Sequence, residues 1–173
     1  MARTADWRID LMRAHPRLFE IMPDDPERSL GYPLCEAGWR DVLERICARI
    51  DNALKANETF EFFRIKQKFG IARFDWYCGV SDETSTRIHE AVNLAVARSA
   101  CTCEICGAQG RLHSNCGWLA TRCADHAAGD PVLVRAGLEN VRILRRRPGA
   151  PDIYHARYDR ETDTLKEVLG SEE

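Results

Sequence analysis

The sequence lacks long apolar runs, a strong net charge and a membrane-targeting segment. Its 173 residues include 25 Lys and Arg against 27 Asp and Glu, which gives a formal net charge of -2. Bulk charge alone therefore does not make the chain a general nucleic-acid binder. No stretch approaches the length of a membrane span, and the opening residues, MARTADWRID, contain no apolar signal core. These features predict a cytoplasmic protein without membrane contact.

Several patterns of enzyme chemistry are also missing. The chain has no P-loop, no dinucleotide-binding glycine pattern and no Ser/Cys–His–Asp grouping. It also lacks the His-x-Glu and Pro-Cys-x-x-Cys pair of zinc deaminases. Asp125-His126 superficially resembles the Asp–His pair of an HNH-type nuclease, but no Asn/His pair follows it on a helix. We therefore expect a non-catalytic protein, with an HNH-like metal-dependent nuclease as the least favoured alternative.

Cysteine, by contrast, is abundant. The chain has eight cysteines, and their spacing in a reducing compartment favours metal binding and buried thiols over disulfides. Two residues separate Cys103 from Cys106, and two separate Cys123 from His126. Gly107 supplies the backbone freedom that a tight turn needs after the first pair. Two such pairs indicate a zinc-ribbon or treble-clef site, and four protein ligands predict a structural Zn²⁺.

Other assignments of these residues stay open. The four could be buried reduced thiols beside an incidental histidine, and Cys101 could replace Cys103 as a ligand. His113 and Cys116 could hold a second ion. Alternatively, His113 is a surface loop residue and Cys116 a small apolar one.

Hydrophobic periodicity predicts an α+β fold. Helices are expected over residues 5–15, 37–54 and 81–99, and a β-hairpin over 60–67 and 71–78. The architecture is two main helices packed on a small antiparallel sheet, with a zinc knuckle and a C-terminal β-hairpin extension. A short strand over 117–121 should place Trp118 against the metal loops. We divide the chain into an N-terminal helix and connection (1–34), an α+β core (35–130) and a C-terminal extension (131–173).

Two groups of basic residues are candidate contacts for a partner. The first alternates with aromatic residues in the expected hairpin, and the second lies near the C-terminus. The groups are Arg64, Lys66, Lys68 and Arg73, and Arg145, Arg146 and Arg147. The hairpin pattern is found in nucleic-acid-binding faces, but alternation alone produces it, so we favour a half-buried sheet with one solvated side. The C-terminal cluster could bind phosphates or an acidic partner, or could be a solvated strand end.

Four stretches, taken together, resemble a group of small uncharacterised proteins encoded by tailed phages and prophages. They are Gly38–Leu43 (GWRDVL), Lys66–Phe74 (KQKFGIARF), Cys103–Gly110 (CEICGAQG) and Gly117–His126 (GWLATRCADH). We call these the four motif stretches. The likeness covers residues 12–128 and implies a phage-type origin with zinc bound at Cys103, Cys106, Cys123 and His126.

The resemblance carries no established activity and hence no catalytic residues. It favours an accessory protein that binds a host macromolecule, such as a defence or transcription complex. A nucleic-acid-binding zinc protein is the alternative. The oligomeric state is not predicted.

Overall fold

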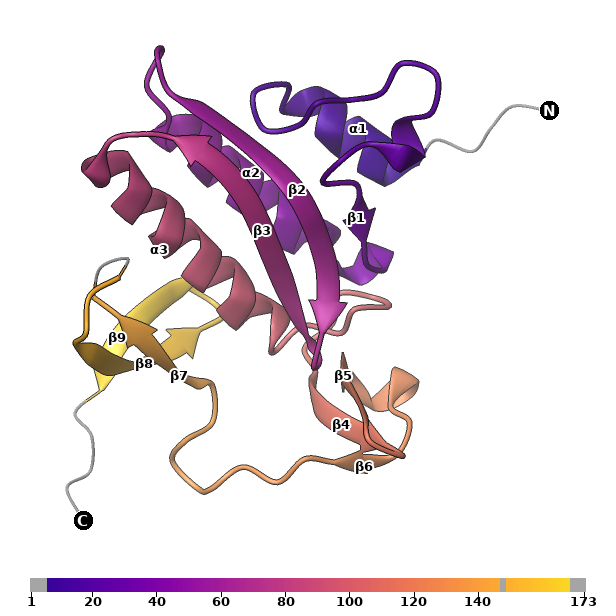
Figure 1. Cartoon of the computed structure of the whole chain (residues 1–173). Coiled ribbons are helices and arrows are strands. Elements are labelled where there is room, and N and C mark those ends of the chain that lie inside the picture. The colour runs from indigo at the N-terminus through magenta and orange to yellow at the C-terminus, as the bar shows by residue number, and fades with distance from the viewer. Residues whose placement is uncertain (1–5, 147–148, 169–173) are drawn as a thin grey trace.

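The computed structural model describes residues 6–146 and 149–168 (Figure 1). The helices in this part are α1 (Trp7–Ala14), η1 (Pro26–Arg28), η2 (Ala37–Trp39), α2 (Arg40–Ala53), α3 (Asp82–Ser99) and η3 (Ala124–His126). The strands are β1 (Pro33–Leu34), β2 (Thr59–Lys68), β3 (Ile71–Gly79), β4 (Arg111–Asn115), β5 (Trp118–Arg122), β6 (Asp130–Pro131), β7 (Val141–Arg145), β8 (Ile153–Asp159) and β9 (Thr164–Val168).

The α+β class is confirmed, with more sheet than the sequence predicted. The described strands form three three-stranded sheets, in the orders β1-β2-β3, β5-β4-β6 and β7-β8-β9. The expected C-terminal hairpin is present as β8 and β9, and β7 adds a third antiparallel strand. The two-residue strands β1 and β6 are too short to have a periodic signal of their own. In the described chain, no helix combines the length and apolarity that a membrane crossing needs.

The main core lies between α2, α3 and one face of the β2–β3 hairpin (Figure 1). Apolar residues recur along α2 at three- and four-residue steps, so that one side of the helix is buried. Cys47 lies on that side and is fully buried, so it is a core residue. In β2 and β3, Phe62, Ile65 and Phe74 point into the same core. A bulge in β2 after Phe62 keeps Phe62 and Ile65 on one face although they are three residues apart.

A tight turn joins β2 to β3. Phe69 and Gly70 both adopt positive φ angles, of 54° and 81°. Two consecutive residues in this conformation are typical of the two-residue turn that matches the twist of an antiparallel hairpin. The turn leaves the Phe69 side chain exposed and directs Gly70 toward the second sheet.

Asp163 joins the C-terminal sheet to the helices. Its carboxylate accepts hydrogen bonds from Arg49 at 2.6 Å, from Arg45 at 3.2 Å and from the Tyr158 hydroxyl at 2.5 Å. The Arg98 guanidinium lies 3.8 Å from the same carboxylate. Asp163 is buried, so these contacts hold a charge away from water while tying the β8–β9 turn to α2 and α3.

We expect Asp163→Asn to loosen the C-terminal sheet selectively. The change keeps the side-chain size and tolerates the left-handed backbone at this position, where φ is 53°. It removes the charge that three arginines share, at an expected cost of about 3 kcal/mol. Hydrogen exchange should accelerate in β8 and β9 and stay unchanged in α2. Equal acceleration in both regions would contradict this role.

The same substitution should alter the response to acid. Burial alone would raise the pKa of Asp163, but the Tyr158 hydroxyl and the Arg49 guanidinium outweigh it and hold this pKa below its usual value. A depressed folded-state pKa means that the stabilisation is complete above the unfolded value of about 3.9 and is lost as the pH falls further. Denaturant titrations should therefore show a constant stability difference between wild type and Asp163→Asn near neutral pH, shrinking in acid.

Candidate metal centre

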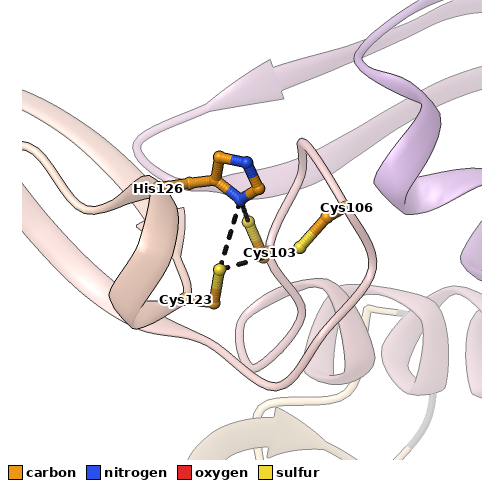
Figure 2. Close-up of side chains that lie close together, drawn as sticks. All are labelled: Cys103, Cys106, Cys123 and His126. Atoms are coloured by element: carbon orange, nitrogen blue, oxygen red, sulfur yellow. Dashed lines mark hydrogen bonds between the residues drawn. The ribbon is translucent and has the colours of Figure 1, made fainter.

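The four predicted ligands converge at one point (Figure 2). Their ligand atoms all lie within 4.8 Å of one another. The Cys123 sulfur lies 3.3 Å from His126 Nδ1 and 3.6 Å from the Cys106 sulfur, and the Cys103 sulfur lies 3.7 Å from His126 Nδ1. Figure 2 shows the imidazole turned so that Nδ1 faces the thiols.

These separations fit a tetrahedral ion. With sulfur ligands at about 2.3 Å and nitrogen at about 2.0 Å from zinc, neighbouring ligand atoms in a tetrahedron lie about 3.5–3.8 Å apart. The three distances above, from 3.3 to 3.7 Å, lie close to that spacing, and all four ligand atoms lie within 4.8 Å of one another. The cluster can therefore hold a metal ion without a large rearrangement of the backbone.

Local backbone structure positions the first pair. Cys103 and Cys106 lie in a turn directly after α3, where the Gly107 N–H donates to the Cys103 carbonyl at 2.8 Å. The Cys103 N–H donates to the Ala108 carbonyl at 2.8 Å and closes the turn. Gly107 has a φ of 80°, which explains the glycine after the second cysteine. We call residues 102–109 the knuckle.

The second pair follows the β4–β5 hairpin. Cys123 comes directly after β5, and His126 lies in the single turn of η3, where its N–H donates to the Cys123 carbonyl at 3.2 Å. The order of the elements is therefore knuckle, β-hairpin and short helix. One ligand pair precedes β4 and the other follows β5, so both pairs lie at the open end of the hairpin.

The surroundings favour a thiolate at Cys103. Burial raises the pKa of this thiol, but backbone N–H groups of Cys123, Cys106 and Ile105 outweigh that effect and lower the pKa to about 6. Because the thiolate is the form that binds metals, the backbone prepares this sulfur to act as a ligand.

The other nearby Cys and His residues lie outside the cluster. The Cys101 thiol is buried and donates to the Arg98 carbonyl, so it does not replace Cys103. Cys116 is exposed in the β4–β5 turn. His113 is buried in β4, contrary to the surface-loop interpretation, and its Nδ1 contacts the Arg111 carbonyl. Among the described residues, the cluster of Cys103, Cys106, Cys123 and His126 is the one group of this kind.

Gly38 and Trp39 donate hydrogen bonds to backbone carbonyl groups of the knuckle. The Gly38 N–H donates to the Glu104 carbonyl at 2.8 Å, and the Trp39 indole donates to the Thr102 carbonyl at 2.8 Å. A Cβ atom on Gly38 would lie 2.3 Å from the Cys103 carbonyl oxygen, far inside van der Waals contact. Only glycine allows this approach. The first motif stretch thus fits directly against the third.

Glu104, between the two cysteines, links the knuckle to two further elements. One carboxylate oxygen accepts from Arg122 at 3.0 Å, and the other accepts from the Glu36 N–H at 3.3 Å. Glu104 is buried, so both bonds form in a largely dry environment. Sequence analysis missed this role because a residue inside a Cys-x-x-Cys pair is usually read only as a spacer.

The hairpin tip completes the convergence of the four motif stretches. The Thr121 hydroxyl donates to the Gly70 carbonyl at 2.6 Å, and the Gln67 amide donates to the Leu119 carbonyl at 2.7 Å. Figure 1 shows the β2–β3 turn beside β4 and β5. The second motif stretch therefore contacts the fourth, and the cluster lies among all four.

Trp118 does not pack against the metal loops, contrary to the sequence-based expectation. It begins β5, pairs with Asn115 across the turn and is 69% exposed. The ligand Cys123 lies at the opposite end of the strand, so Trp118 is directed away from the cluster.

The structure brings the four basic hairpin residues onto one face. Arg64, Lys66 and Lys68 alternate along β2, and Arg73 lies directly opposite Lys66 on β3. This outer face is the one turned away from α2 and α3. Asp75 lies opposite Arg64 and binds two of the guanidinium groups, that of Arg64 at 2.6 Å and that of Arg73 at 3.1 Å.

Aromatic rings accompany these cations. Phe63 and Tyr77 stack with their ring centroids 4.4 Å apart, and the Arg64 guanidinium lies over the Phe63 ring. Tyr77 is 62% exposed and Phe69, at the tip, is 68% exposed. The outer face thus combines positive charge with accessible rings.

The C-terminal basic group lies elsewhere. Arg145 donates to the Ala150 carbonyl at 2.6 Å, and Arg146 pairs with Glu167 at 2.7 Å and with Asp152 at 3.5 Å. Both residues belong to the β7 region, which lies beside α3 and away from the hairpin (Figure 1). Arg147 lies outside the described residues. The two predicted basic groups therefore do not form one surface.

Comparison of the chain with protein-family models, curated proteins and solved structures finds no match of any of the three kinds.

Proposed function

We propose that the cluster binds one structural Zn²⁺ and that the chain is a non-catalytic binding protein of phage type. The convergence of three sulfurs and one imidazole nitrogen, all within 4.8 Å of one another, carries this proposal. Thiolate and imidazole ligands in this geometry favour zinc among the common divalent ions. Four protein ligands leave no position for water or substrate, which favours a supporting role over a Lewis-acid role.

The element order supports a treble-clef-like arrangement, in which a knuckle, a hairpin and a short helix share the ion. His126 serves best as the fourth ligand, which disfavours its use in an HNH-type nuclease. The metal then supports the contacts of Gly38, Glu104 and Thr121, and through them the position of the β2–β3 hairpin. We infer that the metal centre and these contacts hold the β2–β3 hairpin as a rigid surface.

That surface is the outer face of the hairpin, with Arg64, Lys66, Lys68, Arg73 and the exposed Tyr77. Exposed aromatic side chains and arginines are the residue types that contribute most to protein–protein binding. We propose that a host protein complex, such as a defence or transcription complex, binds here.

A charge reversal tests the surface. We expect Lys66→Glu to abolish recovery of the host complex when the full chain is used as bait in a bacterial lysate. Lys66 lies at the centre of the face, and the new carboxylate lies opposite Arg73, so the hairpin should still form. Arg13→Glu, an equal charge change on the exposed side of α1, serves as the matched control.

A complex retained by Arg13→Glu and lost with Lys66→Glu, both in nuclease-treated lysate, is the expected result. Equal recovery with both variants would contradict the assignment of this face. A complex that disappears on nuclease treatment of the wild type would favour the alternative function, because nucleic acid would then mediate the recovery.

The alternative is nucleic-acid binding by the same outer face, which the alternation of cations with stacked rings favours. Its salt dependence is predictable. Four phosphate contacts on duplex DNA would give a slope of log K against log salt of about -3.6, and two contacts a slope of about -1.8. Because Asp75 already binds Arg64 and Arg73, the shallower slope is expected for this alternative. No binding at low salt would remove it.

A further inference from the structure

One cavity of the structure contains neither a ligand of the metal cluster nor a residue of the β2–β3 hairpin in its lining. Its volume is about 600 Å³, and it lies where the end of the knuckle meets the C-terminal sheet. Residues that supply polar groups to its lining include Gln109, Asn140, Arg157, Arg160, Glu161 and Lys166.

Two cations lie side by side on the adjacent strands β8 and β9, which line this cavity. Arg157 on β8 is the register partner of Lys166 on β9, so the two side chains project from the same face of the sheet. Like charges directly opposite each other destabilise an antiparallel pair unless something compensates them. Lys166 lies 3.4 Å from Asp159, whereas within the described part of the chain Arg157 donates only to the Gly137 carbonyl, at 2.6 Å.

Arg160 adds a third cation. One of its terminal nitrogens donates to the Gly107 carbonyl of the knuckle at 3.0 Å. Its Nε atom is buried without a hydrogen-bond partner in the described structure. Among residues 6–146 and 149–168, neither Arg157 nor Arg160 forms an ion pair with a carboxylate. Two guanidinium charges at one cavity therefore lack an anionic partner.

The cavity's own acids do not supply one. Asp159 accepts hydrogen bonds from the Glu161 and Thr162 N–H groups in addition to its contact with Lys166. Glu161 is exposed at the rim. Three cations against these two acids leave a net positive charge, and the amides of Gln109 and Asn140 supply further N–H donors.

We propose that this cavity binds a phosphate group. Guanidinium and ammonium donors from two strands and a turn suit an oxyanion that accepts several hydrogen bonds. The volume exceeds the need of a free phosphate ion and lies within the range of small-molecule sites, so a phosphomonoester of nucleotide size also fits. The bound phosphate would neutralise the Arg157–Lys166 pair and join the knuckle to the C-terminal sheet.

The test is a titration of the full chain with inorganic phosphate and, separately, with AMP, followed by NMR of backbone amides. The buffers are matched in ionic strength with chloride. Saturable shifts are expected at Gln109, Asn140 and Arg160. Tighter binding of AMP than of phosphate would identify a phosphomonoester as the ligand class, and equal affinity would identify the free ion.

Three variants are expected to differ in their affinity for phosphate: one binds more weakly, one more tightly and one as the wild type does. Arg157→Ala should weaken binding about tenfold, because it removes a charged hydrogen-bond donor. Glu161→Ala should strengthen binding about threefold, because it removes a like charge at the rim. Arg13→Ala, on the exposed side of α1, should leave the affinity unchanged.

Thermal melting of each variant confirms that it is folded before titration. The proposal is overturned if neither probe causes saturable shifts at the cavity, or if Arg157→Ala and Arg13→Ala have the same effect on a folded chain. The outcome is independent of the partner-binding proposal, because the hairpin's outer face contributes no residue to this cavity.

Discussion

Replacing Cys106 with serine is expected to lower the melting temperature by about 10 °C or more, because loss of a structural metal is among the most destabilising single changes. The same variant should lose bound zinc and become less soluble. The knuckle has little apolar core of its own, so a bound metal ion would contribute much of its folding free energy. Differential scanning calorimetry with metal analysis measures both effects on one sample.

Cys116→Ser is the matched control for this experiment. Cys106 and Cys116 are both exposed cysteines near the β4–β5 hairpin, and only Cys106 belongs to the cluster. The control should keep its zinc and its melting temperature. A Cys106→Ser protein that is metal-free yet melts like the wild type would disprove the structural role of the metal.

Gly38→Ala is expected to destabilise the chain by about 2–3 kcal/mol, as overpacking in a dry contact does. The added methyl group would lie 2.3 Å from the Cys103 carbonyl oxygen and 2.5 Å from the Glu104 carbonyl oxygen. Both atoms belong to the backbone of the knuckle, which must move to make room. The displaced knuckle should also release its metal faster to a chelator.

Gly79→Ala separates this effect from a general cost of replacing glycine. Its added methyl group would meet only the Thr59 hydroxyl, at 2.9 Å, and that side chain can rotate away. We expect a near-normal melting temperature and an unchanged rate of zinc release for Gly79→Ala. Equal chelation rates for the two variants would show that the Gly38 contact does not support the metal centre.

The metal cluster could be predicted from sequence because its geometry is local. Each ligand pair spans a single turn, so the spacing of Cys103 with Cys106 and of Cys123 with His126 largely fixes where the ligand atoms point. The helices and the β2–β3 hairpin were equally predictable, because each has a strong hydrophobic period.

What could not be predicted depends on contacts between distant segments. Strand β7 has a basic sequence that does not predict its pairing with β8. The role of Asp163 depends on Arg45 and Arg49, which lie far away in the sequence. His113 is buried because β4 is the central strand of its sheet, with Pro131 of β6 as a neighbour. No local pattern records these distant partners.

The joint occurrence of the four motif stretches has a physical explanation in the fold. Gly38 fits against the knuckle, Gly70 accepts a bond from Thr121, and Glu104 binds Arg122. Each stretch supplies one side of a contact whose other side lies in another stretch. A change in any one of them should therefore disturb the metal centre without touching a ligand.

X-ray absorption spectroscopy at the zinc edge of the purified full-length chain tests the central claim most directly. The account predicts one zinc per chain, with three sulfur ligands at about 2.3 Å and one nitrogen at about 2.0–2.1 Å. A coordination shell with fewer sulfurs and added water oxygens would indicate an open, reactive metal. A folded chain without any metal would contradict the account altogether.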